Sequence, residues 1–286
     1  MSGLGALIRL RLRSGRVGLL AAPAAIAGLV AVTAASIAGL YDTAEARAGY
    51  AASIGDSASG AAFNGRGYDL DTVGGITALE VGLFGQLLVA ACGIGLAIRH
   101  TRREEESGLT ELITATRIAP LAPLTSAAVA VGGACTAAGA LSALAVGSAG
   151  YGAGIGLLMA AYAGVGLVAG QLAQAARTAW TLALGFLLAT FLVRATVDGR
   201  GLDATWLSPL GWPAEIRPFG AAPRLWPVLA LAAMTLAMTV TAVVIARRRD
   251  LGAGVVAPRL GPPRARPGLV SPLGLAARLA SGALAG

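Results

Sequence analysis

The densest group of ionisable side chains lies between Arg99 and Pro120, in the stretch RHTRREEESGLTELITATRIAP. Thr101 can cap a helix whose first turn carries Glu104–Glu106, because carboxylates stabilise the positive end of a helix dipole. Gly108 can end or bend this helix, and the apolar residues after it recur at helical spacing. The pattern predicts a short amphipathic helix that inserts into a groove on a partner protein. A solvated loop whose charges only fix the membrane topology explains the same residues equally well.

No residues with the types and spacing of a catalytic centre accompany this segment. His100 is the only histidine, and the sequence contains no Walker A motif, no HExxH motif and no nucleophile elbow. The alternating glycines of Gly147–Gly156 resemble a dinucleotide fingerprint, but the preceding strand and the later acidic residue are missing. Cys92 and Cys135 stand alone in apolar runs, without metal-ligand spacing. We therefore predict a protein that is not an enzyme and binds no cofactor or metal.

The composition indicates an integral membrane protein. Hydrophobic residues make up 56% of the 286 residues and charged residues 13%, with a mean hydropathy of +0.73. Soluble domains carry about twice that share of charge. The net charge of +8 comes from arginine, which in membrane proteins gathers on the cytoplasmic side, so we expect contact with membrane lipid and not with nucleic acid.

Long uncharged runs predict an all-α fold with six transmembrane helices in residues 17–246. Each helix needs about 20 apolar residues, so the 59-residue uncharged run from Ile118 to Ala176 contains two, with the break in Gly147–Gly156. The other four are predicted at Val17–Tyr41, Ile76–Ile98, Thr178–Val197 and Leu225–Ala246. Arg194, near the end of the fifth span, is expected to extend towards the interface. Residues 42–75 form either a small capping structure or a flexible loop.

Residues 1–16 predict an amphipathic helix in the headgroup layer, because leucine and isoleucine alternate with arginine there. The basic residues of this helix are Arg9, Arg11, Arg13 and Arg16. A cytoplasmic N-terminus would place 16 of the 22 arginines inside, as the positive-inside rule requires. We therefore expect a multi-pass protein of the plasma membrane with both termini in the cytoplasm.

The C-terminal part carries a weak internal repeat. Residues 247–270 form a cytoplasmic linker rich in proline and arginine. After it, the sequence Arg278–Gly282 (RLASG) matches Arg11–Gly15 (RLRSG) near the start. We therefore interpret residues 271–286 as the beginning of a second, truncated six-helix repeat, since internal repeats are common in transporters.

Four stretches give a resemblance to a known family. They are YDLDTVGGIT (Tyr68–Thr77), RHTRREEESGLTEL (Arg99–Leu112), WLSPLGW (Trp206–Trp212) and RRDLGAG (Arg248–Gly254). The sequence resembles ABC type-2 exporter permeases, and more narrowly the actinobacterial polyketide-antibiotic exporters of the tetronasin type. In that family a permease of two six-helix halves works with a separate ATP-hydrolysing subunit. This sequence departs from the pattern by containing one half, either as a fragment or as a half-length chain that assembles in pairs.

The resemblance implies a permease subunit that exports a lipophilic compound, such as an antibiotic, and that needs an ATPase subunit and a second permease half. It also implies that Ile8–Arg16 is an elbow helix leading into the bundle. The ATPase would bind a coupling helix formed by Thr101, Glu104, Glu105, Glu106, Gly108, Leu109, Glu111 and Leu112. Substrate-binding residues stay unassigned. We expect that Glu105→Arg together with Glu106→Arg would leave membrane insertion intact and uncouple export. The alternative is a scaffold or immunity protein in the membrane that binds a partner without transport.

Overall fold

The computed structural model describes residues 3–54, 58–114, 118–249, 254, 271–274 and 276. The chain divides into two compact units, Met1–Val256 and Ala257–Gly286. In the second unit the described residues form a helical turn, in which the Gly274 N–H donates to the Ser271 hydroxyl over 3.1 Å. The predicted linker beyond Arg249 and the predicted start of a second repeat fall largely outside the described residues.

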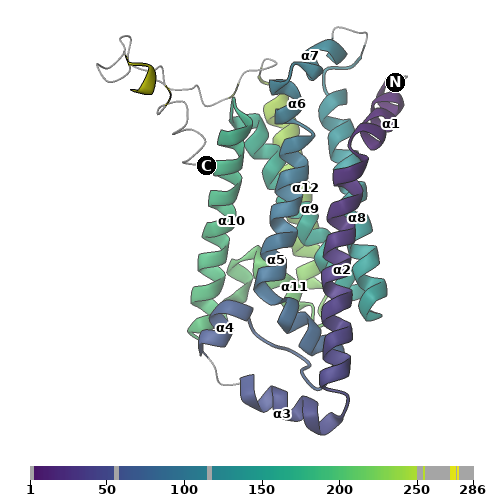
Figure 1. Cartoon of the computed structure of the whole chain (residues 1–286), viewed down its shortest axis with the longest axis vertical. Helices are drawn as coiled ribbons and strands as arrows, with labels where there is room; N and C mark the ends of the chain where they lie inside the picture. Colours follow the sequence, from purple (N-terminus) through teal and green to yellow (C-terminus); the bar gives the residue numbers. More distant parts are fainter. Residues whose placement is uncertain are drawn as a thin grey trace. The chain divides into compact units, whose positions relative to one another are not determined.

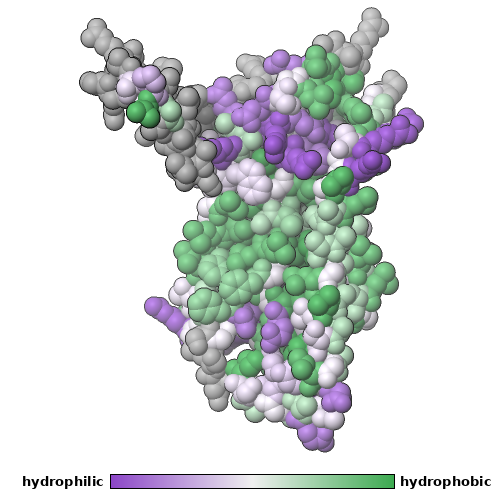
Figure 2. All heavy atoms as spheres, in the orientation of Figure 1, coloured by the Kyte–Doolittle hydropathy of each residue, from purple (hydrophilic) through white to green (hydrophobic). Residues whose placement is uncertain are grey.

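The first unit contains six helices that are long and apolar enough to cross a membrane, and the described residues form no strand. This confirms the predicted all-α membrane fold. The six helices are α2 (Arg16–Leu40), α5 (Val73–Arg99), α8 (Ala122–Val146), α9 (Ala149–Leu172), α10 (Ala176–Gly199) and α12 (Trp226–Ala246). Figure 2 shows their apolar side chains as a belt, with charged residues gathered above and below it.

Short helices lie at both ends of this bundle (Figure 1). One end, here called the α6 end, carries α1 (Leu4–Ser14), α6 (Arg102–Glu106) and α7 (Leu109–Thr114). The opposite end, the α3 end, carries α3 (Ala44–Ile54), α4 (Ala58–Asn64), α11 (Trp212–Glu215) and the 3-10 turns η1 (Thr205–Leu207) and η2 (Pro209–Gly211). The segment between the first two spans therefore forms a small capping structure, which was one of the two predicted alternatives.

Helix α9 is the centre of the bundle, in contact with α5, α8, α10 and α12. Small residues bring the neighbouring backbones together: a Cβ added at Gly139 would lie 2.7 Å from the carbonyl oxygen of Gly152. The break between α8 and α9 is shorter than the predicted Gly147–Gly156. It consists of Gly147, whose φ is +69°, and Ser148, whose hydroxyl caps α9 by accepting from the Tyr151 N–H over 3.3 Å. The glycines that follow are helical because they allow close packing, which outweighs their weak helix propensity.

Helix α5 bends at Gly82, where φ is +38°. A Cβ at this position would lie 2.9 Å from the carbonyl oxygen of Asn64, so the end of α4 packs directly against the bend. The helix begins three residues before the predicted Ile76, because the Thr72 side chain caps it by accepting from the Gly75 N–H over 2.9 Å. The second span is therefore a bent helix longer than the apolar run alone predicts.

The contact between α5 and α9 should be highly sensitive to side-chain size. A Cβ at Gly93 would overlap the carbonyl oxygen of Met159, whereas one at Gly133 on α8 would meet open space. We expect Gly93→Val to lower the free energy of unfolding by at least about 1–3 kcal/mol, because backbone atoms yield less than side chains. Gly133→Val is the matched control and should leave the melting temperature of the detergent-solubilised protein unchanged. Equal melting temperatures for the two variants would contradict this packing.

Candidate functional site

The predicted coupling helix is two short helices, α6 and α7, joined at Gly108. Gly108 has a φ of +75° and ends α6, as predicted. The predicted capping role of Thr101 is wrong, because its hydroxyl donates to the carbonyl oxygen of Ala97 over 2.6 Å. Thr101 is buried against α9, where a Cβ at Gly170 would lie 3.2 Å from its hydroxyl oxygen. The start of α6 is therefore fixed by packing on the bundle and not by a side-chain cap.

Glu104 ties α6 to α1 through Arg11. The two side chains form an ion pair of 2.8 Å. Arg11 also donates to the Ser126 hydroxyl over 2.8 Å and to the carbonyl oxygens of Pro123 (3.1 Å) and His100. Burial lowers the pKa of Arg11, and Glu104 opposes this shift, so the guanidinium stays charged at neutral pH.

The burial of Arg11 corrects the prediction for the elbow helix. Arg9, Arg13 and Arg16 are exposed, as a helix in the headgroup layer requires, but Arg11 is only 5% exposed. The reason is that α1 packs on α8, which covers the face of α1 that carries Leu7 and Arg11. A pattern of alternating leucine and arginine does not distinguish a buried arginine from an exposed one.

Glu105 lies between two arginines. It pairs with Arg102 over 2.8 Å and with Arg249, which follows α12, over 2.6 Å. Arg102 is 1% exposed and donates to the carbonyl oxygen of Gly170 in α9 over 2.8 Å, and Arg249 donates to the Gln171 side chain over 2.7 Å. Glu105 therefore connects α6 with the end of α9 and with the segment after α12.

Glu106 is more exposed and contacts a third element. Its carboxylate accepts from the backbone N–H of Ala176, the first residue of α10, over 3.3 Å. The acidic triplet, Glu104–Glu106, thus holds α6 against α1, the end of α9, the residues after α12 and the start of α10. Glu104 and Glu105 form ion pairs within the protein, so their carboxylates are not free for a partner.

Helix α7 differs from α6, because its exposed side chains include large apolar ones. Leu112 is 73% exposed and Leu109 is 41% exposed, while Thr110 between them is buried. Glu111 is also exposed. The predicted contact residues therefore divide into two groups: Leu109, Glu111 and Leu112 are accessible on α7, whereas Thr101, Glu104 and Glu105 anchor α6 to the bundle.

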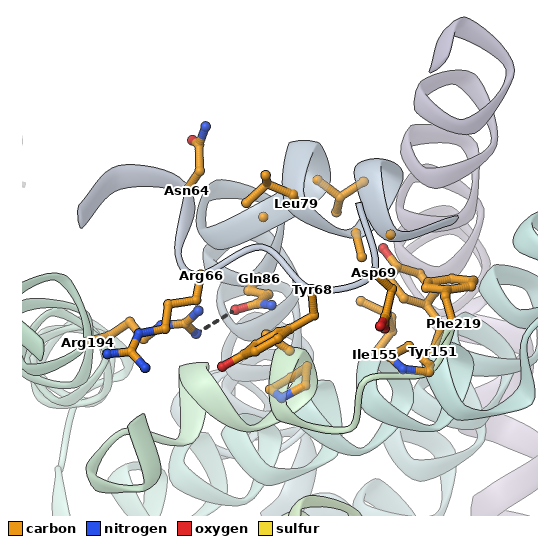
Figure 3. A pocket seen from close by; sticks show the side chains of 17 residues that line it. Asn64, Arg66, Tyr68, Asp69, Leu79, Gln86, Tyr151, Ile155, Arg194 and Phe219 are labelled. Atoms are coloured by element: carbon orange, nitrogen blue, oxygen red, sulfur yellow. Dashed lines mark hydrogen bonds between the residues drawn. The ribbon is translucent and has the colours of Figure 1, made fainter. Parts of the chain in front are cut away.

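A second ion-paired cluster lies at the α3 end, and it corrects the prediction for Arg194. This residue is 1% exposed instead of extending to the interface, because it pairs with Asp198 and donates to the carbonyl oxygen of Leu210. It also contacts the Gln86 side chain, 3.5 Å away, and both residues line a cavity of about 30 Å³ (Figure 3). The i, i+4 spacing of Arg194 and Asp198 is the sequence signal for this pair.

Two further contacts join the loops of the α3 end. Arg66 pairs with Asp203 over 2.8 Å. Glu215, which is buried, accepts from the Tyr68 hydroxyl and pairs with Arg224 over 2.7 Å. The Arg66–Asp203 and Tyr68–Glu215 contacts join the segment before α5 to the segment between α10 and α12. Sequence reasoning missed these two because their partners are 137 and 147 positions apart in the chain.

The pairing of Arg11 with Glu104 should make a large contribution to stability. Removing one partner of a buried ion pair leaves the other uncompensated, which costs about 3–5 kcal/mol. We expect Arg11→Gln to lower the melting temperature of the solubilised protein strongly, while Arg13→Gln, on the exposed face of the same helix, leaves it unchanged. Equal melting temperatures for the two variants would show that Arg11 does not anchor α1.

The sequence matches no known family model. It is 37% identical, over 292 aligned residues, to the multidrug efflux system permease protein Rv1217c of Mycobacterium tuberculosis. The alignment covers 97% of this chain and 52% of that protein, so the chain spans about half the length of the curated relative. The narrower resemblance to tetronasin-type exporters stays a prediction. This chain, whose described residues include six membrane-length helices, is thus a membrane protein that is similar, along nearly all of its length, to part of an efflux permease.

Proposed function

We propose that this chain is one six-helix half of the permease of an ATP-driven exporter, which moves lipophilic compounds out of the cell. A separate ATP-binding-cassette subunit would hydrolyse the ATP. The observation that carries the proposal is the attachment of α6 to α1, α9, α10 and Arg249 through the acidic triplet. A partner that displaced α6 and α7 would move all of these elements together. The similarity to a multidrug efflux permease supports the same function.

The distribution of arginine supports a cytoplasmic position for the α6 end. Among the described residues, the arginines at that end are Arg9, Arg11, Arg13, Arg16, Arg99, Arg102, Arg103, Arg177, Arg247, Arg248 and Arg249. Those at the α3 end are Arg47, Arg66, Arg194, Arg200, Arg217 and Arg224. Because cytoplasmic loops carry the excess of basic residues, the α6 end faces the cytoplasm, where an ATPase would bind.

The contact surface for the ATPase is α7, and α6 transmits the movement. Leu109 and Leu112 form an exposed apolar face suited to a groove on a partner. Because buried ion pairs hold α6 to the bundle, a push on α7 becomes a rigid-body shift of the spans. This revises the expectation for Glu105→Arg. Since Glu105 lies between Arg102 and Arg249, reversing its charge would place three cations together and destabilise the fold itself.

A second six-helix half would complete the exporter. The alignment covers about half of the relative, which supports a machine built from two such units, either joined in one chain or assembled from separate copies. The substrate path would run between the two halves, along helix faces of small and apolar residues.

The apolar face of α7 provides a test of the ATPase contact. We expect Leu109→Gln together with Leu112→Gln to weaken co-purification of the cognate ATPase by about tenfold or more, since two exposed anchors are lost, a change of about 1.4 kcal/mol. The melting temperature should not change. Leu202→Gln, an exposed leucine at the α3 end, is the control and should keep the complex. If the parent chain, paired with a second half, bound no ATPase, the scaffold alternative would replace this proposal.

The ion pair between Glu105 and Arg249 provides a test of whether movement of α6 passes to the segment after α12. We expect Arg249→Gln to keep the ATPase bound but to reduce the permease-dependent stimulation of ATP turnover, because α6 then loses its connection to the segment after α12. Arg248→Gln changes the same charge at a neighbouring exposed position and should leave the stimulation unchanged. Equal stimulation in both variants would show that movement does not pass through Arg249.

A further inference from the structure

A groove of about 750 Å³ lies between α2, α5 and α10 at the α6 end. Helix α5 forms its floor with the small residues Ala91, Cys92 and Gly95, and Figure 1 shows α5 between α10 and α2 on this side of the bundle. Trp180 of α10 forms one wall. A Cβ at Gly95 would lie 3.1 Å from the Trp180 indole, so the glycine allows the ring to lie against α5. The inner part of the groove is therefore apolar and shallow.

The rim of this groove is basic. Arg99, Arg103 and Arg177 line it and are exposed, and within the described part of the chain none of them forms an ion pair. The carboxylate at the rim is Glu106, whose oxygen accepts from the Ala176 N–H. Arg99 extends along the start of α2, since a Cβ at Gly18 would lie 3.6 Å from its guanidinium. The rim thus holds three cationic groups against one anionic group.

We propose that this groove binds an anionic phospholipid from the membrane leaflet at the α6 end. An acyl chain would lie on the small residues of α5, between α2 and α10, and the phosphate would lie among the three arginines. The volume falls within the range of about 300–1,000 Å³ that is usual for ligand sites. Guanidinium groups bind phosphate oxygens in bidentate geometry, and basic pockets between membrane helices select anionic headgroups.

The polarity of the groove favours a lipid over a protein segment. Apolar surface and positive charge are separated along the helices, with the charge at the α6 end of the groove, which matches the tail and headgroup of a single phospholipid molecule. This lipid site rests on the proposed second half packing against another face of the bundle, whereas neither an ATPase nor transport is needed to fill it.

Trp180 can report the occupant directly. The full chain, with Trp206, Trp212 and Trp226 replaced by phenylalanine, would be placed in phosphatidylcholine nanodiscs containing a lipid with brominated tails, which quenches nearby tryptophan. We expect brominated phosphatidylglycerol to reach half-maximal quenching at a mole fraction at least about fivefold lower than brominated phosphatidylcholine. That ratio corresponds to the contribution of one arginine, about 1 kcal/mol.

Two variants test whether the preference for phosphatidylglycerol comes from the arginines at the rim of the groove. In Arg99→Gln/Arg103→Gln/Arg177→Gln the preference for phosphatidylglycerol should disappear, whereas Arg9→Gln/Arg13→Gln, which removes exposed charge at the same end but outside the groove, should keep it. Native mass spectrometry of the chain with all four tryptophans should likewise show retained phosphatidylglycerol that the triple variant loses. Equal quenching by both lipids, or selectivity in the triple variant, would overturn the proposal. Quenching by neither lipid would also overturn it, because protein would then cover the groove.

Discussion

The arrangement of the α6 end depends on the requirement that a charge removed from water be paired. A buried ion without a partner costs several kcal/mol, so each carboxylate of α6 takes its position from an arginine or a backbone N–H on another element. Helix α6 has five residues, far fewer than an isolated helix needs to be stable. Its position is therefore set by the contacts of Glu104 with Arg11, of Arg102 with Gly170 and of Glu105 with Arg249, and any force that moves it acts on α1, on the end of α9 and on the segment after α12.

The α3 end uses the same kind of interaction with different partners. Arg194 and Asp198 are paired within the last turns of α10, and Glu215 joins Tyr68 to Arg224 across the loops. Between the two ends the helices are held by close contact at glycine and alanine, with α9 in the centre. Polar clusters therefore close the bundle at both ends, and the middle is stabilised mainly by packing, with the Tyr162 and Thr190 hydroxyls hydrogen-bonded over 2.7 Å between α9 and α10. Ion pairs at the two ends and close packing between them fit a bundle that moves as a rigid body. The ion pairs of the α6 end lie where a partner could push on them, and those of the α3 end hold the loops there.

The sequence predicted the spans well and the polar contacts poorly, for a physical reason. An uncharged run reports membrane burial directly, so the predicted Leu225–Ala246 and the observed Trp226–Ala246 differ by one residue. The ion pairs Arg11–Glu104 and Arg249–Glu105 join residues 93 and 144 positions apart, and one sequence shows charges without showing which of them meet. The pair Arg194–Asp198, at i, i+4, was available to sequence reasoning and was missed. Of the predicted coupling residues, Leu109, Glu111 and Leu112 on α7 are accessible, whereas Glu104 and Glu105 on α6 are paired with arginines inside the protein.

The bend at Gly82 has a consequence for the thickness of bilayer that suits this protein. At 1.5 Å per residue, Val73–Arg99 would be about 40 Å long as a straight helix, longer than the hydrocarbon core of about 30 Å. The bend leaves Leu83–Arg99, about 25 Å, as the straight part, while Val73–Val81 is held to α3 by the Tyr50 hydroxyl bonded to Glu80. Hydrophobic matching at α5 is therefore set by the shorter segment, and a thicker bilayer would draw lipid tails against the capping helices, whereas one continuous span would accommodate it by tilting less.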